Sequence, residues 1–486
     1  MILKELLFGF EVVRIVGNTE IEITGIQSDS RRITEGNIFV AQTGTTVDGH
    51  EFIAQCVSNG ATVIVLDKPA YMPTESNGVT YILVKNSDEA LGKMAHLWYG
   101  EPSKHLKLVG VTGTNGKTTT ATLLYRLFKT MGEKVGLLST VINYVDDESV
   151  ASTHTTPDAL SLNALLAQMV AAGCTYAFME VSSHAIAQQR IAGLEFAGAL
   201  FTNLTRDHMD YHKTFDHYRD TKKCLFDHLN KNAFAITNID DKNGLIMTQN
   251  CRAKVYTYST RSMADFRGKI LEESFEGMNL DINGMEVFVQ FVGRFNVQNI
   301  LAIYGTLRMM GFDAQESLIQ LSAMKPVNGR FETFRSHEGV TAVIDYAHTP
   351  DALENVLKTV RNIAPDRELI CLFGCGGDRD KTKRPEMAQV AQKLADKIIV
   401  TSDNSRTEKT SDIMADIKEG MDISGRSRSL FIEDREEAIR TAIMIAGQGA
   451  TILLAGKGHE TYQITEKGKM HFDEREIVID AFQQNQ

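Results

Sequence analysis

Apolar residues from Leu106 onward form short runs that alternate with longer segments of helical period. In segment 116–131, for example, Leu124, Leu127 and Phe128 recur at spacings of three and four, as on one face of a helix. Short apolar strands that alternate with amphipathic helices are typical of βα units around parallel sheets, so we predict an α/β fold. The predicted strands cover residues 106–111, 177–181, 199–202, 234–237, 342–344, 369–373, 397–401 and 451–455.

Two segments that contain Gly and Pro interrupt this pattern, at residues 99–104 and 325–329. Because such residues are typical of turns and linkers, we expect domain boundaries near residues 102 and 330. The three resulting domains are an amino-terminal mixed α/β domain (1–102), a central parallel-sheet domain (103–330) and a carboxy-terminal Rossmann-like domain (331–486). At roughly 100–200 residues per domain, a chain of 486 residues is long enough for all three.

The composition is that of a soluble globular protein, with 43% hydrophobic and 23% charged residues. No apolar run reaches the length of a membrane span, so we expect none. Glu5, Glu11 and Arg14 interrupt the amino-terminal apolar residues, which argues against a secretory signal, and we expect the protein to remain in the cytosol. The six cysteines contain no CxxC pair, so we expect reduced, mostly buried thiols rather than a zinc site or disulfides.

The formal net charge is −11, from 62 acidic and 51 basic residues. This balance argues against nucleic-acid binding, because affinity for a polyanion comes from Lys and Arg side chains that neutralise phosphates. A small anionic ligand would then need metal ions or a local basic cluster. The run of Arg379, Lys381, Lys383 and Arg384 is such a cluster and suits a carboxylate-rich substrate.

The strand at 106–111 leads directly into a glycine-containing loop and then into the helix at 116–131. This context predicts a phosphate-binding loop, in which glycines expose backbone N–H groups, Lys117 faces the β- and γ-phosphates, and the Thr118 hydroxyl can bind Mg²⁺. The strict motif has its first glycine at position 111, where this chain has Val111, so the loop is a variant. A glycine-rich turn without a ligand is the alternative. The residues predicted to contact ATP or GTP are Gly113, Thr114, Asn115, Gly116, Lys117, Thr118 and Thr119.

Three polar residues downstream are candidates for metal chemistry. Glu180 ends the strand at 177–181, where ligand crevices of parallel sheets open, and is a candidate second Mg²⁺ ligand; the alternative is a carboxylate in solvent. His208 follows the next strand and could bind a metal through a neutral imidazole or simply brace its loop. Lys222 and its neighbour Lys223 alone indicate only a solvated helix face.

The segments GTNGKTTT (113–120), MEVSSH (179–184), TRDHMDYH (205–212) and YRDTKKCLF (218–226), in this order, resemble the Mur ligases. These are ATP-dependent amide-bond-forming enzymes of bacterial cell-wall assembly. The resemblance implies ATP, two Mg²⁺ ions and a carbamylated lysine at Lys222. It implies that Thr118 and Glu180 hold one ion, that His208 and carbamylated Lys222 help hold the other, and that Lys117, His208 and Lys222 are catalytic.

The resemblance also assigns the remaining contacts. Asn299, Arg330 and Asp345 are expected to reach ATP when the domains close, although Asn299 alone could be a helix cap. The amino-terminal domain resembles the UDP-binding domain of family members that extend the cell-wall peptide. The implied contacts to UDP-N-acetylmuramoyl-L-alanyl-D-glutamate are Ser28, Ser30, Thr155, Thr156, Ser183, Gln188 and Arg190, each of which alone could be an ordinary polar loop residue. The implied amino-acid contacts are Arg379, Asp403, Asn404, Ser405, Arg406, Gly456 and Glu460. His154 and His184 receive no role.

Within the family, the motifs at 345–351, 374–380, 403–406 and 456–460 are similar to those of members that add the third peptide residue through an acyl phosphate. Arg406 implies meso-diaminopimelate, because an arginine can grip its distal carboxylate, but Ser405 stands where such members have proline. L-lysine or another diamino acid, and a specialised paralogue, therefore remain open. A P-loop ATPase regulator is the alternative from another class; folate polyglutamylation would leave the amino-terminal domain unexplained. We expect a monomer.

Overall fold

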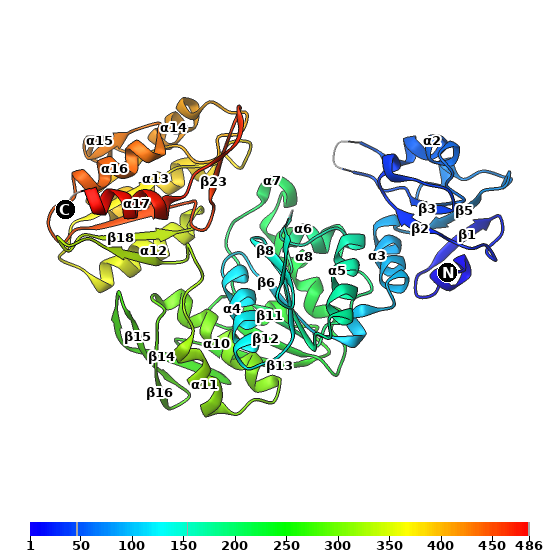
Figure 1. Ribbon diagram of the computed structural model, residues 1–486, viewed down its shortest axis with the longest axis horizontal. Coiled ribbons are helices and arrows are strands. Elements are labelled where there is room, and N and C mark those ends of the chain that lie inside the picture. The colour runs from blue at the N-terminus through cyan, green and yellow to red at the C-terminus, as the bar shows by residue number, and fades with distance from the viewer. Residues whose placement is uncertain (45–46, 153, 485–486) are drawn as a thin grey trace.

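The computed structural model describes residues 1–44, 47–152 and 154–484 of the chain, which form three lobes in sequence order (Figure 1). Each lobe is built around its own β-sheet, of five, eleven and six strands within the described residues. The sheets change between β5 and β6 and between β16 and β17, on either side of residues 102 and 330. The α/β class is confirmed, as are all eight predicted strands, with shifts of one or two residues at their ends.

The amino-terminal lobe has the strand order β1-β5-β4-β3-β2, in which only β1 runs antiparallel to its neighbour. Every residue of β3 and β4 is buried, as expected for central strands covered on both faces. Helix α3 packs on α5 of the next lobe, where His96 Nδ1 lies 3.0 Å from Asn163 Oδ1. The elements of this lobe are α1 (Leu3–Leu6), β1 (Val12–Val16), β2 (Gly25–Gln27), β3 (Asn37–Val40), α2 (Ile53–Ser58), β4 (Val63–Leu66), β5 (Thr80–Val84) and α3 (Ser87–Trp98).

The central lobe has the strand order β16-β15-β14-β13-β12-β11-β6-β10-β7-β8-β9, with β6 between the parallel strands β10 and β11. Both of those strands therefore deliver their carboxyl ends beside the loop that follows β6. Its elements are β6 (Lys107–Thr112), α4 (Lys117–Thr130), β7 (Val135–Leu138), β8 (Ile142–Val145), β9 (Glu148–Ala151), α5 (Ala159–Ala171), β10 (Tyr176–Glu180), α6 (Ser183–Ala187), β11 (Gly198–Phe201), α7 (Met209–His212), α8 (Phe215–Asp227), β12 (Phe234–Asn238), α9 (Gly244–Met247), β13 (Lys254–Ser259), β14 (Phe266–Ser274), β15 (Gly277–Ile282), β16 (Met285–Val289), α10 (Arg294–Met309) and α11 (Ala314–Ala323).

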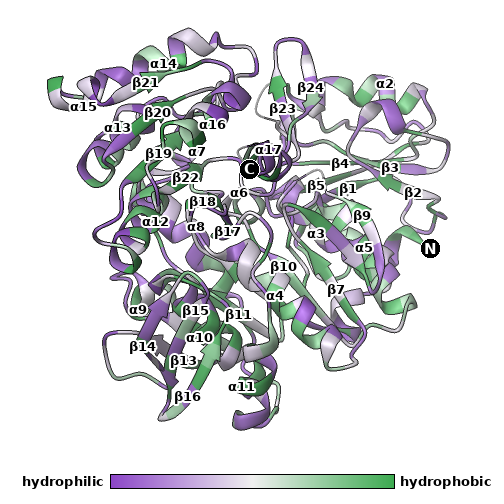
Figure 2. Cartoon of the chain, turned by 60° about the vertical axis from the view of Figure 1, so that its left-hand side comes forward, coloured by the Kyte–Doolittle hydropathy of each residue, from purple (hydrophilic) through white to green (hydrophobic). Residues whose placement is uncertain are grey.

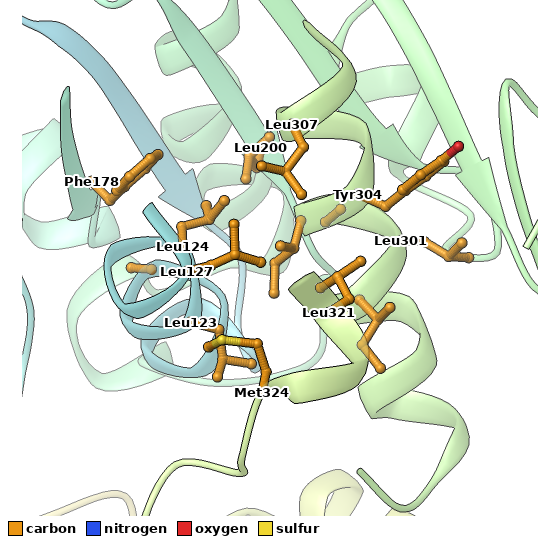
Figure 3. Close-up of a cluster of buried hydrophobic side chains, with 14 of the residues drawn as sticks. Leu123, Leu124, Leu127, Phe178, Leu200, Leu301, Tyr304, Leu307, Leu321 and Met324 are labelled. Atoms are coloured by element: carbon orange, nitrogen blue, oxygen red, sulfur yellow. The ribbon is translucent and has the colours of Figure 1, made fainter. Parts of the chain in front are cut away.

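Helix α4 is held in place by the largest apolar cluster of this lobe. Leu124 and Leu127, predicted to share one face, lie in the cluster with Phe178 of β10 and with Leu301 and Leu307 of α10 (Figure 3). Fully burying a leucine side chain is worth about 1.5–3 kcal/mol, so the cluster fixes α4 firmly against the sheet and α10. The loop before α4 is therefore mounted on a rigid base.

The carboxy-terminal lobe has the strand order β17-β18-β22-β19-β20-β21, and only β17 is antiparallel. The central strands β18, β22 and β19 are mostly apolar and buried along their whole length (Figure 2). Its elements are β17 (Glu332–Arg335), β18 (Thr341–Asp345), α12 (Pro350–Ile363), β19 (Leu369–Phe373), α13 (Lys383–Leu394), β20 (Lys397–Val400), α14 (Thr410–Glu419), α15 (Ile423–Ser427), β21 (Ser429–Phe431), α16 (Arg435–Met444), β22 (Thr451–Ala455), β23 (Tyr462–Thr465), β24 (Gly468–His471) and α17 (Glu474–Gln484).

All six cysteines are free, and four are buried while Cys224 and Cys251 are partly exposed, which confirms the expectation of mostly buried thiols. Among the described residues, no helix combines the length and the apolar character needed to cross a membrane.

Candidate nucleotide and substrate site

The loop between β6 and α4 depends on two glycines with positive φ. Gly113 has φ +150°, and a Cβ on it would lie 1.9 Å from Thr202 Oγ1. Gly116 has φ +88° and precedes the first residue of α4, Lys117. Only glycine adopts such backbone conformations without strain and tolerates such close approach. The loop thus presents the amino-terminal end of α4 to a ligand, as a phosphate-binding loop does.

Two lysine side chains meet at this loop. Lys117 Nζ donates to the carbonyl oxygens of Gly113 and Thr114 at 2.9 and 2.8 Å, and Lys222 Nζ donates to that of Gly113 at 2.9 Å. Burial lowers the pKa of both ammonium groups, and Lys117 lowers the pKa of Lys222 further. The solvated-face interpretation of Lys222 and Lys223 is wrong, because α8 turns both side chains inward; their exposed fractions are 1% and 8%.

Glu180 and Thr118 lie side by side behind the loop. Thr118 Oγ1 donates to Glu180 Oε2 at 2.9 Å, and the backbone N–H of Thr140 donates to Oε1 at 2.8 Å. Glu180 is 1% exposed, so the alternative of a carboxylate in solvent is wrong. A hydroxyl and a buried carboxylate in contact are the oxygen ligands that Mg²⁺ takes together with phosphate and water oxygens. In the described part of the chain, no cluster of three or more His, Cys, Asp or Glu side chains is suited to a metal by itself.

His208 precedes α7 and lies beside Asp207. Its Nε2 is 3.4 Å from Asp207 Oδ2, and its ring meets that of His184 edge to face, with centroids 4.9 Å apart. Burial lowers the pKa of His208 to about 4, so the imidazole is neutral near pH 7. A neutral imidazole is the form that can bind a metal.

Asn299, which is expected to reach ATP, lies against the same loop. Asn299 Oδ1 is 2.5 Å from the position of a Cβ on Gly116, and Asn299 Nδ2 donates to Asn296 Oδ1 at 3.2 Å. The cap alternative for Asn299 is wrong, because α10 begins at Arg294, with Gly293 at the cap position. Asn299 therefore lines the nucleotide loop from within α10.

Arg330 and Asp345 lie together at the joint between the central and carboxy-terminal lobes. The Arg330 guanidinium lies 4.6 Å from the centre of the Tyr346 ring, and Asp345 Oδ2 accepts the backbone N–H of Phe331 at 2.8 Å. Burial raises the pKa of Asp345 to about 6, although nearby Arg330 opposes the shift. Among the described residues Arg330 Nε has no hydrogen-bond partner although it is buried, which leaves a donor for a ligand.

The residues expected to bind the UDP-linked substrate fall into two groups. Five lie at the carboxyl edge of the central sheet: Thr156 Oγ1 donates to Glu180 O at 2.8 Å, and Arg190 donates to Thr156 O and to the Gln188 side chain. Thr155 Oγ1 lies 3.0 Å from Thr140 Oγ1, and Ser183 Oγ lies 2.9 Å from His212 Nε2. Ser28 and Ser30 lie partly exposed in the amino-terminal lobe, and no hydrogen bond among the described residues joins them to the other five.

The residues expected to bind the amino acid gather at the carboxyl ends of β20 and β22. Asn404 Nδ2 donates to Glu460 Oε2 at 2.8 Å, and Arg406 Nη1 donates to Gly377 O at 2.7 Å. Arg406 has φ +52°, and its Nη1 lies 3.0 Å from the position of a Cβ on Gly376, near which Arg379 Cγ also lies. The other guanidinium nitrogens of Arg406, Nε and Nη2, make no hydrogen bond to a described residue, so they can face a carboxylate.

Ser405 contributes to the shape of this loop through its backbone. Its carbonyl oxygen accepts the Glu408 N–H at 3.0 Å, and a Cβ on Gly377 would lie 2.0 Å from that oxygen. The neighbouring Arg406 N–H donates to Ile464 O at 3.2 Å. These contacts hold the loop without the fixed φ of a proline.

The basic run at 379–384 is not the free cluster that we expected. Arg384 is fully buried and pairs with Glu408 and Asp416 at 3.0 and 2.7 Å, and Lys381 pairs with Glu408 at 3.1 Å. Helix α14, which packs on α13, carries Asp416, and Glu408 lies just before it, so residues distant in sequence offset the charges of Lys381 and Arg384. Lys383 Nζ donates to His348 O at 2.9 Å.

Three site residues were missed by the sequence interpretation. Lys457 is fully buried and donates to Asn404 Oδ1 and Glu460 Oε2 at 3.2 and 3.3 Å, at the centre of the expected amino-acid site. Asp351 Oδ2 accepts from Asn115 Nδ2 at 3.3 Å, across the lobes. Asp207 lies close enough to Lys117 for its negative charge to oppose the lowering of the Lys117 pKa. Each lies inside a motif that resembles the family, at 205–212, 345–351 or 456–460, and only that position could have indicated a role in the site.

The fold and the loop together define a multidomain P-loop protein whose nucleotide site lies beside its carboxy-terminal lobe. Family models match almost the whole chain: the Mur ligase family catalytic domain at residues 22–99, the Mur ligase middle domain at 111–307, and the Mur ligase glutamate ligase domain at 329–458. The chain belongs to the Mur ligase family.

Several relatives are similar along their full length. A UDP-N-acetylmuramoyl-L-alanyl-D-glutamate–2,6-diaminopimelate ligase of Parabacteroides distasonis is 54% identical, with 100% of both chains covered. The ligase of the same name from Bacteroides fragilis is 53% identical, with 99% of both chains covered. A solved structure with that name is 31% identical, with a TM-score of 0.70 and coverage of 100% of this chain and 99% of its own. MurF from Acinetobacter baumannii, 17% identical with a TM-score of 0.62 over 96% of this chain and 94% of its own, shares the fold.

Proposed function

We propose that this protein is an ATP-dependent ligase that adds meso-diaminopimelate to UDP-N-acetylmuramoyl-L-alanyl-D-glutamate during peptidoglycan precursor synthesis, and so supports cell shape and division. The observation that carries the proposal is the identity of more than 50% along the whole chain to ligases of that name. The contacts of Lys222 with the nucleotide loop and of Glu180 with Thr118 support it.

The proposed reaction has two steps. The γ-carboxylate of the D-glutamate attacks the γ-phosphorus of ATP, ADP leaves with the electron pair of the broken P–O bond, and an acyl phosphate forms. The amine of the amino acid then attacks the acyl carbon, loses a proton and expels phosphate. Lys117 suits the first step, because its ammonium is held by two loop carbonyls and can exchange them for phosphate oxygens.

Magnesium belongs to this proposal. The contact between Thr118 and Glu180 supports one ion, and His208 with carbamylated Lys222 would hold a second. Bound Mg²⁺ would neutralise charge on the phosphates. The buried Lys222 suits carbamylation because its lowered pKa favours the neutral amine, which attacks CO₂, forms an N–C bond and releases a proton.

The choice of meso-diaminopimelate rests on Arg406. Its guanidinium is anchored by one nitrogen to the loop backbone, while its planar fork can pair with the distal carboxylate of the amino acid. L-lysine has no carboxylate at that position, so it would leave Arg406 without a partner. The hydrogen bonds around Ser405 hold the loop, so its serine is compatible with this choice.

Other parts of the proposal follow from this function. The amino-terminal domain (1–102) would bind the UDP moiety, the central domain (103–330) ATP, and the carboxy-terminal domain (331–486) the amino acid. Because ATP and a UDP-linked sugar are cytosolic metabolites, we place the enzyme in the cytosol. We propose a monomer, since one chain carries all three sites.

The direct test is phosphate release from ATP with Mg²⁺ and UDP-N-acetylmuramoyl-L-alanyl-D-glutamate, with meso-diaminopimelate, L-lysine, L-ornithine or no amino acid in parallel. We expect stimulation by meso-diaminopimelate alone. Preference for another amino acid would contradict the role of Arg406 but keep the ligase. Turnover that is indifferent to every amino acid would contradict the ligase and favour an ATPase regulator.

A further inference from the structure

Ser183 and His212 form a buried pair at the edge of the expected substrate site. Ser183 is the first residue of α6, three positions after Glu180, and His212 is the last residue of α7. His212 Nε2 lies 2.9 Å from Ser183 Oγ, and the two residues are 1% and 2% exposed. At this distance the two groups share a hydrogen bond.

The His212 ring is fixed by its neighbours. Ring centroids of Tyr211, Tyr218 and His184 lie 4.8, 5.1 and 5.7 Å from that of His212. The backbone carbonyl of His212 accepts the Thr214 N–H at 2.7 Å, which holds the turn after α7. Because the ring is packed and the backbone is held, Nε2 stays directed at the Ser183 hydroxyl.

The other ring nitrogen decides where the protons lie. His212 Nδ1 is buried and has no hydrogen-bond partner among the described residues. A buried N–H without an acceptor is costlier than a buried nitrogen lone pair without a donor. When a ligand oxygen accepts the Ser183 hydroxyl proton, the neutral tautomer with its proton on Nε2 is favoured, because it leaves only the Nδ1 lone pair without a partner, and Nε2–H donates to Ser183 Oγ. The hydroxyl proton of Ser183 then has no acceptor among the described residues and needs one from a ligand.

We infer that His212 is a positioning residue for the UDP-linked substrate: it holds the Ser183 hydroxyl so that its proton points to an acceptor oxygen of that substrate. The inference rests on the proposed function, in which Ser183 contacts this substrate. Neighbouring groups are already occupied within the chain, since Thr156 Oγ1 donates to Glu180 O and Gln188 accepts from Arg190. Ser183 is thus a hydroxyl of this edge whose proton is available to an outside acceptor.

The test replaces His212 with residues that keep different parts of the ring. In His212→Phe the packing stays and Nε2 is lost, and in His212→Asn the amide lies too close to the backbone to reach Ser183. Both variants are expected to raise the Kd for UDP-N-acetylmuramoyl-L-alanyl-D-glutamate about tenfold in calorimetric titration, the loss of one ordinary hydrogen bond. In His212→Gln the amide nitrogen replaces Nε2, and the Kd is expected to return to within about threefold of the wild type.

Three further measurements separate positioning from a general structural effect. The KM for ATP should stay within about twofold in every variant, and in a Ser183→Ala background His212→Phe should add no further increase in Kd. His228→Gln, at an exposed histidine after α8, should behave as wild type. Thermal melting reports which variants fold, and His212→Asn replaces His212→Phe if the latter does not.

The outcomes distinguish the two ideas. An unchanged Kd in folded His212→Phe or His212→Asn, or Kd increases of His212→Phe and Ser183→Ala that multiply in the double variant, would overturn the inference while the ligase stands. A wild-type protein that does not bind the UDP-linked substrate would instead overturn the proposed function.

Discussion

A buried ion pair in the carboxy-terminal lobe provides a demanding test of the structure. Arg435 and Glu474 are both fully buried, with Arg435 Nε 2.9 Å from Glu474 Oε1. Arg435 also donates to the carbonyl oxygens of Ser402 and Ala455 at 2.9 and 2.8 Å. These carbonyls directly precede the two loops expected to bind the amino acid. The arginine therefore sets the spacing of those loops as well as neutralising Glu474.

Arg435→Met removes all these bonds and leaves the Glu474 charge buried. Breaking a buried pair by removing one partner costs about 3–5 kcal/mol. At about 2–4 °C per kcal/mol for a domain of this size, the melting temperature of the carboxy-terminal lobe should fall by about 6–20 °C. Glu474→Leu in the same chain removes the orphaned charge, so the double variant should be more stable than Arg435→Met alone.

Differential scanning calorimetry of the full chain measures these shifts. Arg440→Met is the matched control, because Arg440 pairs with Glu436 and Asp480 at the surface, where an ion pair contributes about 0–1 kcal/mol. A melting temperature of Arg435→Met within about 2 °C of the wild type would show that Arg435 does not stabilise this lobe through the buried pair. A double variant that lost the sum of the two single losses would show that the two side chains do not stabilise each other.

Three other predictions concern the nucleotide site. Gly116→Ala places a Cβ 2.5 Å from Asn299 Oδ1 on a residue with a φ of +88°, and it should raise the KM for ATP at least about tenfold. The control is Gly132→Ala, because Gly132 has a similar φ of +85° but open space around its Cβ position, and this variant should leave the KM unchanged. Equal effects of the two variants would contradict the role of the close approach to Asn299. Lys222→Ala should abolish ligation, and short-chain carboxylates should restore part of it; full activity without them would exclude the carbamate. Asp345→Asn tests the raised pKa of the Asp345 carboxyl group. In the wild type the folded state binds the carboxyl proton more tightly than the unfolded state does. The stability that this protonation contributes is therefore present below pH 4 and lost as the pH rises through about 6. Relative to the wild type, the free energy of unfolding of Asp345→Asn should rise between pH 4 and pH 7 by up to about 3 kcal/mol in denaturant titrations, and a pH-independent difference would contradict the shift.

Much of the fold followed from local pattern. The eight predicted strands and the helix after the nucleotide loop were found within one or two residues, because apolar period and glycine position are local properties. The contact between Glu180 and Thr118 was also predictable, since parallel strands deliver their carboxyl ends to one edge.

Long-range packing accounts for what the sequence could not supply. Lys222 follows a polar stretch of α8, so the sequence gives no sign that it is buried. Only the tertiary structure shows that the Lys222 amine is buried and donates to the Gly113 carbonyl oxygen. The sequence predicted a free positive charge at Arg384, whereas the fold pairs Arg384 with Glu408 and Asp416. The Ser183–His212 bond joins residues 29 positions apart, on helices whose orientation no local pattern specifies.

The sequence by itself determined the α/β class through the periodicity of its apolar residues. It determined the nucleotide loop and the family through short motifs and their order along the chain. The tertiary structure alone decided which charges are paired, which polar atoms lack partners and which motif residues meet. The physical reason is that burial and hydrogen-bond partners are set by elements distant in the chain, and these determine the pKa of Lys222 and Asp345 and the donors left for a ligand.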